Sequence, residues 1–324
     1  MKILVVGGAG YIGSRLIPDL LVHNYDITVL DLLWFRNQLP ANVKVVKKDV
    51  FDIDESFLHG FDQVIFLAGL SNDPMAEFSP AMNFISNAAA PAYLAYIAKR
   101  AAVKRYIFAD SCSVYGYTIN QLYDEESPVT CAYPYGISKL QGEFGAMQLA
   151  DDDFSVICLR QGTVSGVSPR MRFDLIVNTM YMTALGKRRI TVNNPSIWRP
   201  ILAIEDAVGA YIRAIQADQS ISGIFNVASG NYTVGDVADI VWKKLTAKFD
   251  LDIDMEINNV QDFRNYKVSA QKAQAILGAR FHGSVEAIVD ELAEKFPPDF
   301  NFDQDNYYNI RVFKKIFNKD GNNS

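Results

Sequence analysis

The sequence has few of the residues that build disulfide frameworks and metal centres. Among its 324 residues there are three cysteines and three histidines, and no histidine stands in a metal-ligand spacing with another histidine or a cysteine. A disulfide-stabilised secreted scaffold is therefore excluded, and no metal site is predicted. We interpret the three cysteines as buried free thiols, which are typical of a reducing compartment, and we predict a cytoplasmic protein.

The sequence also lacks long apolar segments and an excess of positive charge. The longest uncharged apolar run, residues 88–98, is shorter than the roughly 18 residues that a membrane-spanning helix needs. The first residues form a strand-like run rather than a secretory leader. Lys and Arg number 31 against 37 Asp and Glu, which gives a net charge of −6 and no large positive field. We predict neither a membrane nor a nucleic-acid partner.

Short β-branched runs alternate with longer helical patterns in the first half of the chain. Nearly continuous apolar strands with intervening helices are typical of a parallel sheet covered on both faces. The pattern therefore predicts an α/β fold with a doubly wound, Rossmann-type sheet. The expected strands are 2–6, 27–30, 43–46, 63–67, 105–109 and 155–159, and the expected helices are 11–22, 86–101 and 135–149.

After Gly166 the alternation loosens, and the sequence predicts a smaller C-terminal lobe of mixed structure. A helix at 204–216 and a strand at 223–227 are expected to return to the main sheet. We predict a Rossmann domain of residues 1–166 plus about 200–232, and a substrate-binding lobe of about 167–199 plus 233–324. The polar end of the chain, 314–324, is expected to fray.

A glycine-rich turn follows the first expected strand and precedes the first expected helix. Gly7, Gly10 and Gly13 recur at intervals of three residues. In this context glycines allow a tight turn and a close approach of the backbone to a pyrophosphate, while the helix N-terminus offers unpaired N–H groups. The context favours dinucleotide binding over a merely structural turn.

Acidic residues stand at the ends of the next two expected strands. Asp31 lies 18 residues beyond Gly13, where a carboxylate can accept hydrogen bonds from an adenosine ribose. Such a carboxylate would repel a 2′-phosphate, so NAD is favoured over NADP, although Arg15 or Arg36 could still reach a phosphate. Asp49 is either an adenine contact or a solvated carboxylate.

A tyrosine and a lysine four residues apart predict proton-transfer chemistry. On a helix, Tyr135 and Lys139 project from one face, one turn apart. A nearby ammonium favours the phenolate and lowers the pKa of the tyrosine, which makes it a usable general base. Ser111 lies 24 residues before Tyr135, directly after an expected strand.

With these motifs the chain resembles, over nearly its whole length, the extended short-chain dehydrogenase/reductases that act on nucleotide sugars. The resemblance is carried by Gly7-Gly8-Ala9-Gly10-Tyr11-Ile12-Gly13, Leu67-Ala68-Gly69, Ser111-Cys112-Ser113-Val114-Tyr115-Gly116, Tyr135-Gly136-Ile137-Ser138-Lys139, Leu159-Arg160 and Trp198-Arg199-Pro200. It implies NAD as cofactor and a nucleotide-diphosphate sugar as substrate.

The resemblance also implies a role for each matching residue. The implied catalytic residues are Ser111, Tyr135 and Lys139. The implied cofactor contacts are Gly7, Gly10, Tyr11, Ile12, Gly13, Asp31, Asp49, Val50, Leu67, Ala68, Gly69, Asn87, Tyr135 and Lys139. The implied substrate contacts are Ser113, Thr163, Asn178, Arg199 and Arg264.

Departures from the family pattern limit the reaction. The shared step is hydride removal from a sugar carbon, usually C4, while Tyr takes the hydroxyl proton and Ser holds the oxygen. The 4,6-dehydratases carry Thr-Asp-Glu where this chain has Ser111-Cys112-Ser113, so we do not expect dehydratase activity. Relatives that epimerise at C3 or C5 use a Cys at the position of Ser113, and we interpret Cys112 as a buried packing residue instead.

Two reactions remain: a 4-epimerase, or a 4-dehydrogenase/4-ketoreductase without epimerisation. A non-catalytic NAD-binding protein is the alternative class, although such proteins often lose the Tyr or the Lys. Arg199 and Arg264 are the expected partners of the substrate diphosphate. Arg170 and Arg172 are further options, which we interpret as surface or domain-contact residues, and 187–189 as a solvated face.

The resemblance implies a homodimer. The helix that carries Tyr135 and Lys139 would pack with its neighbour into a four-helix bundle, and the alanine-rich segment 88–98 suits such close packing.

Overall fold

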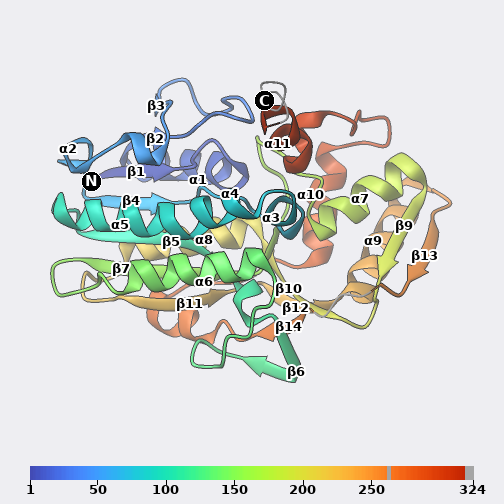
Figure 1. Cartoon of the computed structure of the whole chain (residues 1–324). Helices are drawn as coiled ribbons and strands as arrows, with labels where there is room; N and C mark the ends of the chain where they lie inside the picture. Colours follow the sequence, from blue (N-terminus) through green and yellow to red (C-terminus); the bar gives the residue numbers. More distant parts are fainter. Residues whose placement is uncertain (261–263, 318–324) are drawn as a thin grey trace, which may run out of the picture.

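The computed structural model describes residues 1–260 and 264–317, and its centre is one parallel sheet. The seven strands are β1 (Lys2–Val6), β2 (Asp26–Leu30), β3 (Lys44–Val46), β4 (Gln63–Phe66), β5 (Arg105–Ser111), β7 (Ser155–Gln161) and β11 (Gly223–Val227). Their order is β11-β7-β5-β4-β1-β2-β3, so the chain winds outward from β1 in one direction and from β4 in the other (Figure 1). This arrangement confirms the predicted doubly wound α/β fold.

Helices cover both faces of this sheet. The helices α1 (Tyr11–Val22) and α8 (Ile204–Gln216) lie on one face, and α5 (Ala90–Arg100) and α6 (Pro134–Met147) lie on the other (Figure 1). Alternate side chains of β1 therefore enter different cores: Ile3 and Val5 pack on the α1 side, and Leu4 and Val6 on the α5 side. Burial on both faces explains why the strands are continuously apolar.

The predicted elements of the main sheet occur with ends shifted by one or two residues, and α8 and β11 return to it as expected. The predicted helix 86–101 differs, because it starts with a π-helical turn, Ile85–Ala89, before α5. Pro91 has no N–H to donate to the carbonyl one turn earlier, and such an interrupted ladder favours a local π turn.

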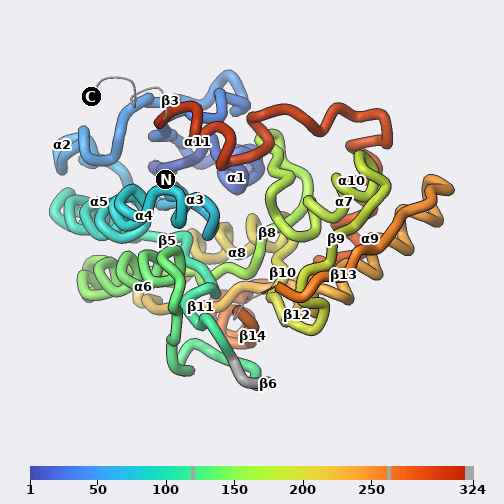
Figure 2. Tube along the Cα trace, turned by 45° about the vertical axis from the view of Figure 1, so that its right-hand side comes forward, coloured from blue at the N-terminus to red at the C-terminus, as the bar shows by residue number. Residues whose placement is uncertain are grey.

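Small sheets and helices form a second layer beyond the ends to which the main strands point (Figure 2). One sheet contains β8 (Thr163–Ser165), β10 (Trp198–Ala203) and β12 (Gly230–Thr233), and two strand pairs join β9 (Arg189–Asn193) to β13 (Asp254–Asn258) and β6 (Tyr117–Tyr123) to β14 (Asn265–Val268). The helices are α7 (Ile176–Lys187), α9 (Val234–Phe249) and α10 (Val285–Lys295). The domain boundaries given above stay a prediction.

Four shorter helices complete the described chain: α2 (Glu55–Leu58), α3 (Asp73–Phe78), α4 (Pro80–Phe84) and α11 (Asn309–Phe317). The last of these comes back across the molecule to α3, where Phe313 packs against Leu70, Met75 and Trp34 (Figure 2). The predicted fraying of 314–324 is therefore wrong for Lys314–Phe317, which are helical, and its remainder lies outside the described residues.

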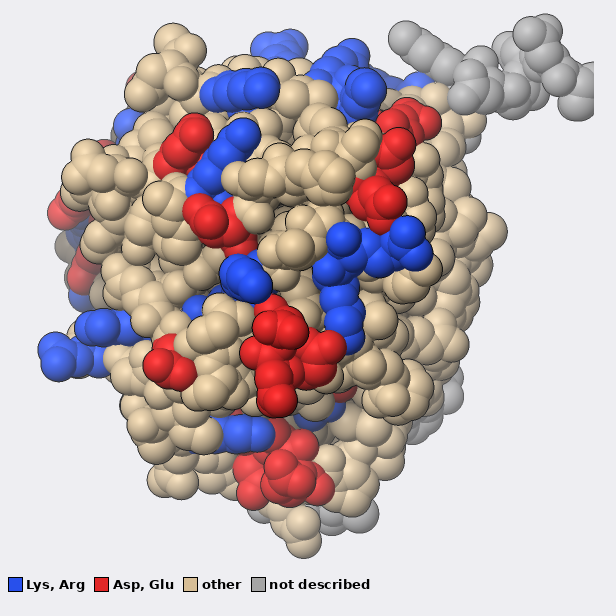
Figure 3. Space-filling model, turned by 90° about the vertical axis from the view of Figure 1, so that its left-hand side faces the viewer, with Lys and Arg blue, Asp and Glu red and all other residues tan. Residues whose placement is uncertain are grey.

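Charge on the surface is mixed where it can be seen. On the face drawn in Figure 3, Lys and Arg side chains lie interspersed with Asp and Glu side chains. Two ion pairs at the end of α5 show the pattern: Arg100 with Glu55, and Lys99 with Asp151. None of the helices in the described ranges has the length and apolarity to cross a membrane.

Candidate active site

A cavity of about 750 Å³ opens at the carboxyl ends of β1, β4 and β5. This edge is where doubly wound sheets bind their ligands. The residues predicted from the sequence that line it are Gly7, Gly10, Tyr11, Ile12, Gly13, Asp31, Asp49, Val50, Leu67, Ala68, Gly69, Ser111, Ser113, Tyr135, Lys139, Thr163, Arg199 and Arg264. One space therefore holds residues from both halves of the chain, although their roles stay predictions.

The glycine-rich turn forms one wall of this cavity. Gly7 has a φ of +77°, and a Cβ there would lie 2.5 Å from the backbone nitrogen of Ala68. A Cβ on Gly13 would collide with the backbone of Gly8. Gly10 begins α1 without a side-chain cap, so the N–H groups of the first helical turn stay available to an anion. The backbone fits the diphosphate of a dinucleotide.

Asp31 stands at the far end of the same wall. Its Oδ2 accepts the Ala9 N–H at 3.0 Å and its Oδ1 accepts the Leu33 N–H at 2.7 Å. Burial raises the pKa of Asp31, and these two hydrogen bonds oppose that rise. Each carboxylate oxygen keeps a further lone pair with which to accept a ribose hydroxyl. Arg15 is paired with Glu205 at 2.6 Å, so its charge is engaged away from the cavity.

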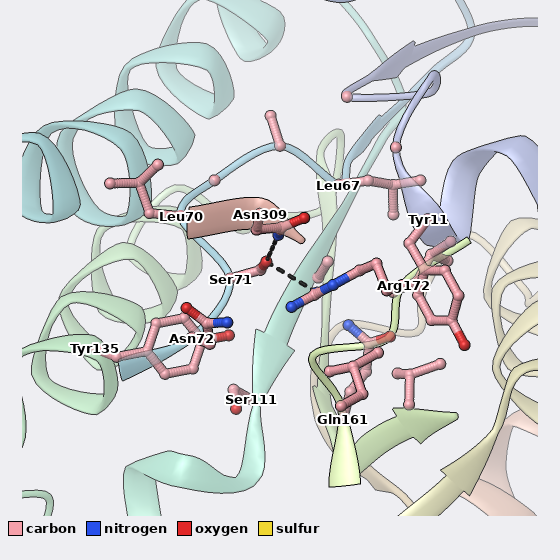
Figure 4. Close-up of a pocket in the computed structure, with 18 of the residues that line it drawn as sticks. Tyr11, Leu67, Leu70, Ser71, Asn72, Ser111, Tyr135, Gln161, Arg172 and Asn309 are labelled. Carbon is pink, nitrogen blue, oxygen red and sulfur yellow. Dashed lines mark hydrogen bonds between the residues drawn. The ribbon is translucent and has the colours of Figure 1, made fainter. Parts of the chain in front are cut away.

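Tyr135 and Ser111 lie next to each other at the end of β5 (Figure 4), and Lys139 lines the same cavity. Tyr135 and Lys139 lie in the first turns of α6, and Ser111 is the last residue of β5. Tyr135 lies next to Ser111, whose Oγ accepts the Ser113 N–H at 3.2 Å. The Lys139 Nζ donates to the Ala109 carbonyl at 2.7 Å. The lysine is thereby fixed beneath the cavity.

The pKa of Tyr135 does not behave as the sequence predicts. Burial raises it above its usual value, and the neighbouring Ser111 hydroxyl is the largest opposing influence. Burial also lowers the pKa of Lys139 to about 8. In the protein alone the Tyr135 pKa is therefore raised rather than lowered, because removal of the phenol from water is the largest influence on it.

Asp110 is a cavity residue that the sequence analysis missed. It is 2% exposed, and neither of its carboxylate oxygens has a hydrogen-bond partner among the residues that the structure describes. Burial, with the nearby charge of Glu143, raises its pKa well above the usual value, while its own charge raises the pKa of Lys139. The available signal was its position directly before Ser111, at the carboxyl end of a strand.

A buried ion pair anchors the helix that carries Tyr135 and Lys139. Arg160 of β7 donates to both carboxylate oxygens of Glu143 on α6, at 2.6 and 2.8 Å. A third hydrogen bond joins Arg160 to the Tyr115 hydroxyl at 2.9 Å. Cys112, which is 0% exposed, donates its Sγ to the Arg160 carbonyl, so its predicted burial is confirmed.

Two predicted contacts do not line the cavity and instead hold its walls. Asn87 accepts from the Leu70 N–H at 3.0 Å and donates to the Leu70 carbonyl at 2.9 Å, which fixes the loop after β4. Asn178 accepts from the Gly166 N–H and donates to the Tyr11 hydroxyl. Both amides are buried and hydrogen-bonded to protein groups. Their positions therefore support a role in holding the cavity walls rather than direct contact with cofactor or substrate.

Arg170 and Arg172 do not lie on the surface, and their contacts with Phe35 and Ser71 agree with the alternative interpretation of domain-contact residues. They are 2% and 5% exposed, and both line the cavity. Arg172 forms an ion pair with Asp174 at 2.8 Å and donates to the Ser71 Oγ at 3.0 Å (Figure 4). The run 187–189 is exposed, as predicted.

Arg199 and Arg264 lie on the opposite side of the cavity. Arg264 forms an ion pair with Asp73, and Arg199 donates to the Arg264 carbonyl. Their guanidinium groups face the rings of Tyr266 and Tyr133, at 5.6 and 5.2 Å. These contacts bring the two arginines to one part of the cavity, where Asp73 offsets the charge of Arg264, and their role toward a substrate stays a prediction.

The fold and this cavity together define a dinucleotide-binding α/β protein in which Ser111, Tyr135 and Lys139 line the ligand cavity. The model of the NAD dependent epimerase/dehydratase family matches residues 3–228, so the chain belongs to this family. Its cofactor is accordingly NAD, which the glycine-rich turn and Asp31 fit.

Individual relatives are similar over most of the chain. A UDP-glucose 4-epimerase from Lactobacillus helveticus is 26% identical over 317 residues, which cover 89% of this chain and 95% of that protein. The structure of MoeE5 in complex with UDP-glucose and NAD has a TM-score of 0.81 and 22% identity, covering 91% and 98% of the two chains. TunA, an NAD-dependent NDP-hexosamine 5,6-dehydratase, has a TM-score of 0.79 and 23% identity, covering 90% and 96%.

Proposed function

We propose that the protein is a nucleotide-sugar 4-epimerase, which oxidises a sugar hydroxyl at C4 and returns the hydride to the opposite face of the carbon. The observation that carries this proposal is the meeting of Ser111, Tyr135 and Lys139 at one end of a cavity with a dinucleotide-binding turn at its other end. The similarity to UDP-glucose 4-epimerases supports it and favours a UDP-sugar as substrate.

The three residues divide the proton chemistry among them. Tyr135 accepts the proton of the sugar hydroxyl once the positive charges of Lys139 and of bound NAD have overcome the effect of burial on its pKa. Ser111, which lies next to Tyr135, holds the same oxygen. When bound, NAD supplies the hydride acceptor and, in the return step, the hydride donor. Lys139, whose pKa is about 8, is largely an ammonium at neutral pH and offsets the negative charge on Tyr135. The return of proton and hydride leaves the cofactor unchanged overall.

The other side of the cavity suits a nucleoside diphosphate sugar. Arg199 and Arg264 supply positive charge for the two phosphates. The Ser113 Oγ is buried and has no hydrogen-bond partner in the described part of the chain, so a sugar hydroxyl would satisfy it. Thr163 adds a further hydroxyl to this lining.

We further propose that the protein is not a 4,6-dehydratase. Elimination of water needs an acid for the departing hydroxyl, and the positions 111–113 hold no carboxylate. The similarity to a 5,6-dehydratase concerns the fold, which epimerases and dehydratases share. Asp110 is a carboxylate of this wall, but we assign it to the control of the Lys139 charge.

The proposal is tested by incubating the protein with UDP-, GDP-, CDP- and dTDP-sugars, with and without added NAD, and analysing the products. We expect a C4 epimer of a UDP-sugar with no net change in NAD. Stoichiometric NADH with a keto-sugar would instead establish the dehydrogenase alternative, and a 4-keto-6-deoxy product would overturn the exclusion of dehydratase activity.

We also propose that two copies associate through α5 and α6. These helices lie side by side on one face of the sheet, and they expose large apolar side chains, with Tyr96 at 50% and Phe144 at 65%. Light scattering after size exclusion should give twice the 36.2 kDa mass of the chain. A mass of one chain would overturn the dimer.

A further inference from the structure

A buried arginine without a carboxylate partner stands beside the glycine-rich turn. Arg170 is 2% exposed and lines the cavity, and its Nε has no hydrogen-bond partner among the described residues. No carboxylate of those residues lies within ion-pair distance of its guanidinium. Its neighbour Arg172 differs in this respect, because Asp174 neutralises it at 2.8 Å. An uncompensated buried charge costs several kcal/mol in proteins, so an anion bound beside the Arg170 guanidinium would stabilise the protein.

The surroundings of Arg170 place it on the cofactor side of the cavity. Its backbone N–H donates to the Ser14 Oγ in the first turn of α1, at 3.2 Å. Its guanidinium stacks on the ring of Phe35, 3.6 Å from the centroid, just beyond β2. The charge of Asp31 is also close enough to act on it. The expected substrate diphosphate partners, Arg199 and Arg264, come from β10 and the segment before β14 instead.

The C-terminal helix holds this guanidinium in position. Asn309, the first residue of α11, accepts a hydrogen bond from the Arg170 Nη2 and donates to the Ser71 Oγ at 2.8 Å. The Asn309 N–H donates to Asp174 (3.3 Å). Figure 4 shows Ser71 between Asn309 and Arg172, with both hydrogen bonds drawn. The helix is kept there by Phe313, which is fully buried against Leu70 and Met75.

We propose that Arg170, positioned by Asn309 of α11, binds the diphosphate of the NAD cofactor through its guanidinium group. Charge-assisted hydrogen bonds to phosphate are stronger than neutral ones, and the stacked ring fixes the plane of the guanidinium before the ligand arrives. Burial and the charge of Arg172 lower the pKa of Arg170 to about 9, and a bound anion would reverse that shift. Asn309 of α11 thereby becomes part of the cofactor site.

The test compares Arg170→Gln, Arg170→Lys and Asn309→Ala with the wild type and with Arg213→Gln, which alters an arginine on α8 outside the cavity lining. Calorimetric titration is carried out with NAD, with ADP-ribose and with adenosine, which has the same base and ribose but no phosphate. The NAD retained by each purified variant is also measured after release by denaturation. These readouts do not depend on the sugar reaction, so failure of the proposed epimerase activity leaves them interpretable.

We expect Arg170→Gln to weaken NAD and ADP-ribose by about 10- to 100-fold, with adenosine little changed. Arg170→Lys should recover part of the loss, because it keeps the charge but not the planar group. Asn309→Ala should weaken the same two ligands less. Wild-type affinity for NAD in Arg170→Gln would overturn the proposal. So would an equal loss for adenosine, which indicates a structural role. NADP is titrated in parallel, and a loss confined to NADP would assign the arginine to a 2′-phosphate instead.

Discussion

Replacement of Glu143 by leucine should loosen the helix that carries Tyr135 and Lys139. The side chains of Glu143 and Arg160 are each 4% exposed and share two hydrogen bonds of 2.6 and 2.8 Å. In Glu143→Leu, Arg160 keeps the longer ion pair with Asp110 at 3.7 Å, so the cost should reach at most the lower end, about 3 kcal/mol, of the range for removing one partner of a buried pair. The unfolding entropy of a 324-residue chain is about 0.7 kcal/mol/K, so the Tm should fall by up to about 4 °C.

Calorimetric melting of four variants checks this reasoning. Glu143→Leu and Arg160→Leu should each lower the Tm, whereas the double variant should melt close to the wild type, because an apolar pair replaces a buried ion pair at little cost. Glu55→Ala, which breaks the exposed pair with Arg100, is the matched control and should leave the Tm unchanged. Single variants as stable as the wild type, or a double variant as unstable as the sum of the singles, would refute the argument.

Three further predictions concern the site. Gly13→Val should abolish retention of NAD, because a Cβ there collides with the Gly8 backbone. The control Gly209→Ala, on the open face of α8, should retain NAD. Equal NAD content in the two purified variants would contradict the steric argument. Turnover should fall as the pH rises through about 8, where Lys139 loses its proton. The substitution Asp110→Asn should shift this fall to lower pH, because the charge of Asp110 raises the Lys139 pKa. A pH–rate profile that is the same in Asp110→Asn as in the wild type would speak against the role of Asp110. Cys112→Ala should leave turnover largely unchanged, and a loss of activity in a folded variant would show that the thiol takes part.

Sequence reasoning placed residues in the cavity correctly where the relevant contacts are local. The glycine-rich turn, Asp31 and the pair Tyr135 and Lys139 each depend on residues close together in the chain, on a strand end or one helical turn. The continuous apolar strands predicted the doubly wound sheet for the same reason, because a strand that is buried on both faces is apolar at successive positions.

The misassigned residues are those whose surroundings come from distant segments. Arg170 is buried by Asn309, which lies 139 residues later in the chain, so no local pattern marks it as a cavity residue. Asn87 is occupied by the loop at Leu70, and only the folded loop shows this. The pKa of Tyr135 depends on how far folding removes the phenol from water. The four-residue spacing to Lys139 gives no information about that burial.

The most direct test of the central claim is Tyr135→Phe assayed with the UDP-sugar that the wild type converts best. The variant lacks only the hydroxyl that accepts the substrate proton, so it should still bind NAD and the sugar nucleotide. Its turnover should fall by about 10²- to 10⁴-fold, and rapid mixing should show no transient reduction of the bound nicotinamide. Turnover equal to that of the wild type, with the variant folded and loaded with NAD, would contradict the account.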